Sequence, residues 1–197
     1  MNLNQKTPRR AFFRKSLYDT MAISAGISLV ATLLPSFTAE AMEVAFMDAP
    51  TAATDKEFRM KVFGPATLSL QTSQIAVSKC TQKNAREFAG FELEEAKSVT
   101  AVLKDLATPM PAMDDKAKGT LEKIKMAKKG AEFDKIFIQA QYENHVFLRD
   151  LAANYLTHAA GKTDPAESQG RHLATLAHAT FSEHVMITKR ILGELGA

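Results

Sequence analysis

Apolar side chains recur every three or four positions along most of the chain, and no stretch alternates regularly between apolar and polar residues. This spacing is typical of amphipathic α-helices. Breaks at Gly64-Pro65, Pro109, Gly130 and Gly161 divide the pattern into segments. We therefore predict helices over residues 54–63, 66–81, 84–108, 114–129, 131–160 and 164–193.

The lengths and links of these helices favour an all-α fold, an antiparallel four-helix bundle that occupies residues 55–197. The lysine-rich segment 114–129 is interpreted as a short extra connecting helix, with Leu121 and Ile124 as its apolar contacts. Residues 42–54, rich in alanine and threonine, are predicted to be a flexible leader.

The predicted inner faces of the helices are apolar at their ends and polar in the middle. They comprise Leu68, Gln71, Ile75 and Ser78; Phe88, Glu92, Glu95, Val99, Val102 and Leu106; Phe137, Gln141, Asn144 or His145, Leu148 and Tyr155; and Leu173, Ala177, Thr180, His184, Ile187 and Ile191. Measured from the turns near Lys83 and Thr163, the polar members lie at similar heights. One polar layer is therefore expected to hold Glu92, Glu95, His145, His184, Gln71 and Gln141.

A buried carboxylate is costly unless it is paired or binds a metal. Carboxylates and imidazoles on facing helices are the ligand set used for iron, manganese or zinc, so Glu92, Glu95, His145 and His184 are candidate metal ligands. Gln71 and Gln141 are candidates for the same layer. Hydrogen bonding between glutamate and histidine without metal satisfies the same groups, and a rotated helix would bury Phe91 in place of Glu92.

The first 41 residues have the three regions of a signal peptide in the right order. A basic segment that includes Arg9, Arg10 and Arg14 precedes a short apolar stretch over residues 21–34, and small residues at 39 and 41 predict cleavage before Met42. We therefore expect export to the periplasm or the extracellular space. Arg9-Arg10 followed by Arg14 resembles the twin-arginine motif for export of folded proteins, and an ordinary secretory signal is the alternative.

The basic character of the whole chain comes from this segment. The chain has 25 basic and 22 acidic residues, but residues 42–197 have 20 of each. The charge thus gives no reason to expect nucleic-acid binding or stable membrane insertion after cleavage. The single cysteine, Cys80, cannot form an internal disulfide, and no catalytic triad of the serine or cysteine type can be placed.

The segment from about Phe58 to Leu195 resembles the secreted, ferritin-like family called domain of unknown function 4142. The resemblance rests on residues 85–89 (AREFA), on the run from Phe133 to His145, and on His184. It implies a ferritin-like bundle, export and no established activity. Family members commonly carry a glutamate in the first helix and an Asp-His pair in the second, whereas this chain has Ser69 and Glu95-Ala96 there.

Two classes of function follow from these observations. The first is a metal-binding or redox protein of the cell envelope that uses the glutamate and histidine layer, with Glu92 and Glu95 substituting for the missing family ligands. The second, which the altered ligand set favours, is a non-enzymatic envelope or stress-related protein. Neither its protein partner nor a small ligand can be identified from the sequence.

Overall fold

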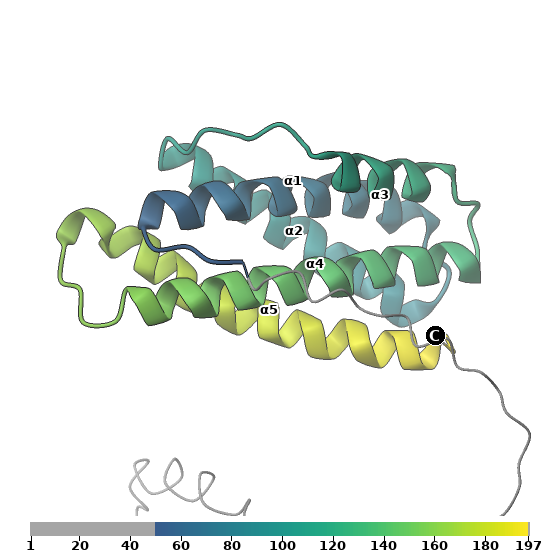
Figure 1. The fold of residues 1–197 in the computed structure, drawn as a ribbon. Helices are drawn as coiled ribbons and strands as arrows, with labels where there is room; N and C mark the ends of the chain where they lie inside the picture. The colour runs from purple at the N-terminus through teal and green to yellow at the C-terminus, as the bar shows by residue number, and fades with distance from the viewer. Residues whose placement is uncertain (1–49, 197) are drawn as a thin grey trace, which may run out of the picture. The chain divides into compact units, whose positions relative to one another are not determined.

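The computed structural model describes residues 50–196, and in them the chain is all-α, as predicted (Figure 1). The predicted signal peptide and residues 42–49 of the predicted leader lie outside the described residues. The helices are α1 (Asp55–Lys79), α2 (Lys83–Asp105), α3 (Asp115–Met126), α4 (Ala131–His158), the short 3₁₀ helix η1 (Pro165–Glu167) and α5 (Ser168–Glu194). None of them is long and apolar enough to cross a membrane.

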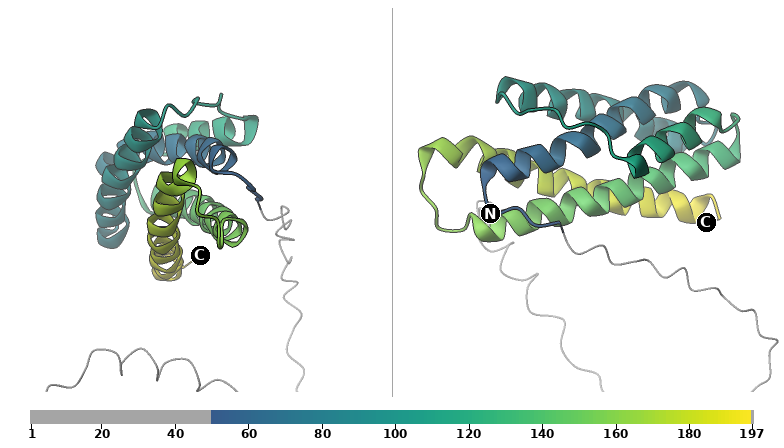
Figure 2. Two further views of the ribbon diagram at one scale, coloured as in Figure 1. Left: turned by 90° about the vertical axis from the view of Figure 1, so that its left-hand side faces the viewer. Right: turned by 45° about the horizontal axis from the view of Figure 1, so that its top comes forward.

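The long helices form two hairpins that pack against each other (Figures 1 and 2). Helix α1 pairs with α2, and α4 pairs with α5, while the short helix α3 lies against α1 and α4. The predicted contacts of α3 are correct, because Leu121 and Ile124 are its buried residues. Side chains from all four long helices can therefore meet in the space between the two hairpins.

The core consists of two apolar clusters with a polar layer between them. One cluster includes Phe58, Leu103 and Tyr155, and the other includes Phe88 and Phe137. Along the helices, a polar stretch separates the two clusters. Its buried polar members are Ser69, Thr72 and Ser73 on α1, Glu92 on α2, Gln141 and His145 on α4, and His184 and Thr188 on α5.

The predicted helix break at Gly64-Pro65 is wrong, because α1 continues through both residues. A proline inside a helix loses one backbone hydrogen bond and costs about 3 kcal/mol. Burial of Val62, Phe63 and Ala66 next to the proline offsets this cost, since each fully buried large apolar side chain contributes roughly 1.5–3 kcal/mol. The same continuity places Ser69 and Thr72 at the level of the polar layer.

Several predicted inner faces are rotated by about one residue. In α1 the buried residues are Ser69, Thr72, Ser73 and Ala76 in place of the predicted stripe. In α2 the buried residues Ala96, Thr100 and Leu103 take the place of the predicted Val102 and Leu106. In α5 the buried residues Ala174, Phe181 and Thr188 take the place of the predicted Leu173, Thr180 and Ile187. A helix turns 100° per residue, so spacings of three and four drift around a straight helix. The packing of small residues against neighbouring helices then determines which side of each helix faces inward.

Two predicted helix starts also differ from the structure. Gln82 rather than Asn84 caps α2, and its side-chain oxygen accepts a hydrogen bond from the backbone N–H of Ala85 at 2.6 Å. Helix α5 begins at Ser168 after a 3₁₀ turn, not at Asp164. For α2 the capping side chain lies two residues before the predicted one, whereas α5 follows the 3₁₀ turn and its first turn has no side-chain cap.

Buried Asp134 of α4 fixes the turn between α1 and α2. Its carboxylate accepts hydrogen bonds from the backbone N–H groups of Thr81 and Gln82, at 3.0 and 2.8 Å, and from the Thr81 hydroxyl at 2.6 Å. These bonds hold one hairpin at a defined height on the first helix of the other. The register of the polar layer depends on that height.

Candidate metal centre

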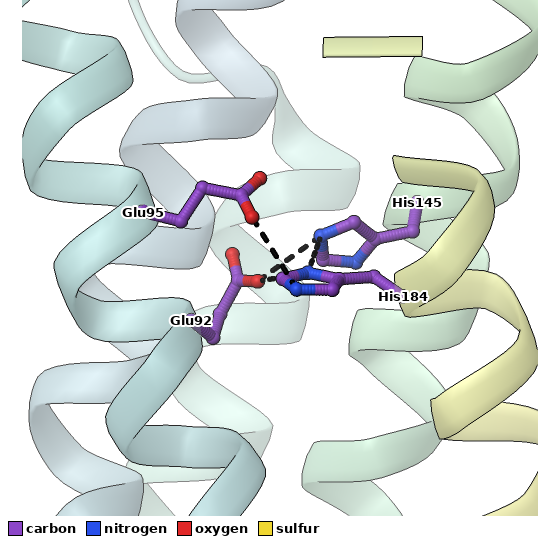
Figure 3. A group of neighbouring side chains, drawn as sticks. All are labelled: Glu92, Glu95, His145 and His184. Atoms are coloured by element: carbon purple, nitrogen blue, oxygen red, sulfur yellow. Dashed lines mark hydrogen bonds and ion pairs between the residues drawn. The ribbon is translucent and has the colours of Figure 1, made fainter. Parts of the chain in front are cut away.

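Four side chains from three helices converge in the polar layer (Figure 3). Glu92 and Glu95 come from α2, His145 comes from α4 and His184 comes from α5. One potential ligand atom from each lies within 4.8 Å of all the others. Glu92, His145 and His184 are buried, whereas Glu95 is partly exposed. The sequence predicted these four residues for one layer, and the structure brings them together.

The orientation of α2 settles which of two adjacent residues faces inward. Glu92 is 2% exposed and Phe91 is 62% exposed, so the carboxylate points into the core and the aromatic ring points out. Phe88, one turn earlier, lies inside and presents its ring to both imidazoles, with centroid distances of 6.2 Å to His145 and 5.1 Å to His184. Aromatic walls of this kind exclude water and strengthen electrostatic interactions inside the site.

Three of the polar atoms form a nearly equilateral triangle. Oε2 of Glu92 lies 3.1 Å from Nε2 of His145 and 3.0 Å from Nδ1 of His184, and the two nitrogens are 3.2 Å apart. Each atom therefore faces the other two. Such an arrangement requires a proton or a cation among them, because lone pairs at these distances repel one another.

The tautomer of His145 is fixed by a backbone contact. Its Nδ1 lies 2.7 Å from the main-chain carbonyl oxygen of Gln141, and because a carbonyl only accepts, Nδ1 must carry a hydrogen. In the neutral ring the lone pair is then on Nε2, which faces Glu92 and His184. A metal-binding histidine shows the same pattern, with its second nitrogen donating to a carbonyl or carboxylate.

Without a metal, protonation of His145 would place an N–H group on Nε2, facing Glu92. Burial, the largest influence, disfavours both charged side chains, but attraction between them outweighs it. The pKa of Glu92 falls to about 2, mainly through the charge of His145 and hydrogen bonds from His145 and His184. The pKa of His145 is raised, mainly by the charge of Glu92 and its hydrogen bond. Both pKa shifts favour an ion pair between Glu92 and His145 when no metal is bound.

Glu95 differs from Glu92 although it lies one turn further along the same helix. Its Oε2 is 3.4 Å from Nε2 of His184, the ring nitrogen that is not part of the triangle. Burial, followed by repulsion from Glu92, raises the pKa of Glu95 to about 7. The two glutamates thus have opposite shifts because only Glu92 faces both imidazoles closely.

The remaining predicted members of the layer do not join the four. Gln141 is buried, but its side chain turns to α1, where it accepts from Ser69 and donates to Thr72 at 3.0 and 2.9 Å. Gln141 contributes to the site through its main-chain carbonyl, which accepts a hydrogen bond from Nδ1 of His145. Gln71 is half-buried and does not belong to the buried stripe of α1. Asn144, the predicted alternative to His145, bonds to Ser69 at 2.9 Å.

Ser69 and Thr72 were missed in the sequence. Ser69 and Thr72 are three residues apart, as are the larger Leu68 and Gln71, so spacing alone did not distinguish the two pairs. The short side chains of Ser69 and Thr72 gave no further indication that they face the core. The other histidines lie outside the group: His158 and His172 are exposed, and His178 is half-buried.

A cavity of about 10 Å³ adjoins both glutamates. Its other walls are mostly apolar, formed by residues that include Ala66, Leu148 and Phe181. A space of this size holds about one water molecule. The space beside the site is therefore about the size of one water molecule.

Comparison with known proteins agrees with the resemblance seen in the sequence. The model of the family described as Domain of unknown function (DUF4142) matches residues 41–184, which is most of the chain, and the chain belongs to this family. No curated protein and no solved structure matches the sequence.

The pKa shifts make the stability of the metal-free protein depend on pH. Glu92, with its lowered pKa, stabilises the fold above pH 4.5, and this is lost as the pH falls towards 2. His145 stabilises it below pH 6.5, and this is lost as the pH rises through its raised pKa. Glu95 is protonated more readily in the folded state, so stability falls between pH 4.5 and 7.

We therefore expect the metal-free protein to lose stability as the pH rises from about 5 through the raised pKa of His145, by at most about 1.4 kcal/mol per pH unit for each titrating group. The variant Glu95→Gln should lose less between pH 5 and 7, because the amide does not titrate. Urea unfolding of chelator-treated protein at several pH values measures both curves. Glu94→Gln, on the exposed side of α2, should follow the wild type, and parallel curves for Glu95→Gln and wild type would contradict the assignment.

Proposed function

We propose that this member of the DUF4142 family binds one divalent transition-metal ion, iron, manganese or zinc, through Glu92, His145 and His184. The observation that carries the proposal is the direction of the lone pairs. The Gln141 carbonyl leaves Nε2 of neutral His145 as an electron-pair donor, and this nitrogen faces a carboxylate oxygen and a second imidazole nitrogen.

The spacing of the three atoms fits the proposal. Zinc bonds to histidine nitrogen and carboxylate oxygen at about 2.0–2.1 Å, and tetrahedral geometry then separates neighbouring ligand atoms by about 3.3–3.4 Å. The separations in the triangle are 3.0–3.2 Å. Movements of a few tenths of an ångström would convert this triangle into one face of a metal site. Two imidazoles and one carboxylate are also a ligand set of mononuclear iron and zinc proteins.

Charge balance supports the same conclusion. Two ionised glutamates in a buried layer repel each other, and the charge must be compensated by protons or by a cation. A divalent ion would neutralise Glu92 and Glu95 together without protonating His145. Proton uptake instead gives the metal-free Glu92 and His145 ion pair, which is the basis of the second candidate, a non-enzymatic envelope protein with a purely structural polar layer.

The surroundings limit what a bound ion would do. The cavity beside Glu92 and Glu95 accepts a molecule the size of water, and aromatic rings close the site elsewhere. We infer a role in holding a metal ion, or in electron transfer to a very small molecule, rather than the conversion of an organic substrate. The paired hairpins formed by α1, α2, α4 and α5 support a ferritin-like four-helix bundle as the scaffold.

The protein purified without added metal should contain about one iron, manganese or zinc ion per chain. His145→Ala combined with His184→Ala should abolish this content, because two of the three ligands are lost. Elemental analysis and thermal unfolding measure the content and the accompanying stability. The matched control is His158→Ala with His172→Ala, which removes two exposed imidazoles and should keep the metal.

Metal-free protein that also fails to bind added zinc would leave only the structural layer. In that case the double variant would be less stable without any change in metal content.

We also propose that the protein is exported, on the strength of the signal-like residues 1–41, and that Arg9 and Arg10 select the route for folded proteins. Folding before export would allow the site to be filled in the cytoplasm. Replacing both arginines with lysine should block export while leaving expression unchanged, as measured by fractionation of cells. The charge-matched control is Lys6→Arg with Lys15→Arg, which changes two basic residues outside the motif. Normal export of the Arg9→Lys, Arg10→Lys variant would overturn the proposed route, and retention of the wild-type protein in the cytoplasm would overturn export.

A further inference from the structure

We infer that Glu95 is a positioning residue that presents Nδ1 of His184 to the metal ion, rather than a ligand itself. This inference rests on the proposed function and assigns different roles to two glutamates one helical turn apart. Glu92 would bind the ion directly. Glu95 would act through the imidazole ring, as the outer carboxylates of many metal sites do.

The two ring nitrogens of His184 have different neighbours. Nδ1 belongs to the triangle, at 3.0 Å from Glu92 and 3.2 Å from His145. Nε2 of the same ring lies 3.4 Å from Oε2 of Glu95 (Figure 3). A neutral imidazole has one lone pair and one N–H group. If Nδ1 uses its lone pair for the ion, Nε2 carries the hydrogen, and the nearest acceptor is Glu95.

Both histidines then follow the same rule by different means. The N–H at Nδ1 of His145 donates to the Gln141 carbonyl at 2.7 Å, and in the proposed metal-bound state the N–H at Nε2 of His184 would have the Glu95 carboxylate, at 3.4 Å, as its partner. In each case the partner fixes the tautomer and limits rotation of the ring. The carbonyl cannot be removed by substitution, but Glu95 can, so the inference is open to experiment.

The burial of the two glutamates fits their different roles. The side chain of Glu92 is 2% exposed, while that of Glu95 is 17% exposed. A fully buried carboxylate needs strong compensation, which direct contact with a cation supplies. A carboxylate at the edge of the layer retains some contact with water and requires only a hydrogen bond. Their spacing along α2 places one at the triangle and the other behind His184.

The test uses zinc binding to the full protein, with affinity measured by competition against a chromophoric chelator. Removing an outer partner of a metal-binding histidine typically weakens binding about 10–100-fold. Glu95→Ala should fall in this range, and Glu95→Gln, which keeps an acceptor oxygen, should lose less. Glu92→Gln should lose more than either. Glu94→Gln is the matched control, because Glu94 is exposed and pairs with Lys97 on the surface of the same helix.

A second measurement separates positioning from ligation. Long-range ¹H–¹⁵N NMR spectra of the zinc-loaded protein should show His184 bound through Nδ1, with a hydrogen on Nε2 that exchanges faster in Glu95→Ala. The visible spectrum of the cobalt-loaded protein should keep its shape in Glu95→Gln, because the ligands are unchanged.

Zinc bound through Nε2 of His184, an altered cobalt spectrum in Glu95→Gln, or unchanged zinc affinity in Glu95→Ala would overturn the positioning role. These outcomes leave the proposed metal site intact. Failure of the wild-type protein to bind zinc would overturn the proposed function itself, so the two failures can be told apart.

Discussion

One hydrogen bond determines how the polar layer must be understood. Because the Gln141 carbonyl holds the hydrogen of His145 on Nδ1, the other nitrogen meets Glu92 and His184 with its lone pair unless the ring is protonated. Under the proposed function the layer has two forms, a protonated ion pair or a metal ion bound among three ligand atoms. Both satisfy the buried charges, and they differ in whether a proton or a metal ion lies between Glu92 and His145. The carbonyl belongs to the turn of α4 that precedes His145, so the helix itself fixes the tautomer of His145.

The rest of the fold shields Glu92 and His145 from solvent and holds the layer in register. Apolar clusters lie on both sides of it along the helices, and the rings of Phe88 and Phe181 contact the imidazoles at centroid distances of 5.1–6.2 Å. Asp134 links the turn between α1 and α2 to α4, which sets the relative height of the hairpins. Placing ionisable groups in this core costs stability that a purely apolar layer would not. A cost of this kind is consistent with a role for the layer beyond folding.

Much of this architecture could be predicted from the sequence. Apolar spacing predicted the helices, and counting from the turns brought Glu92, Glu95, His145 and His184 to one level, because height in a hairpin depends only on distance along the chain. Rotation about the helix axis was less accessible. It depends on how closely neighbouring helices approach, so the stripe on α1 was placed on Gln71 when small Ser69 and Thr72 face the core. The predicted helix break at Pro65 was wrong for a related reason. The local cost of a proline within a helix is clear in the sequence, while the burial of Val62 and Phe63 that offsets this cost is a tertiary effect. The atomic roles of the histidine nitrogens, which separate Glu92 from Glu95, appear only in three dimensions.

The most direct test of a metal site in this layer is X-ray absorption spectroscopy at the edge of the metal bound to the purified protein. We expect a first shell with two imidazole groups and at least one oxygen, at about 2.0–2.1 Å if the metal is zinc. Replacing His184 with alanine should remove one imidazole from that shell. A shell made only of oxygen atoms, or one unchanged by the His184 substitution, would contradict metal binding by Glu92, His145 and His184.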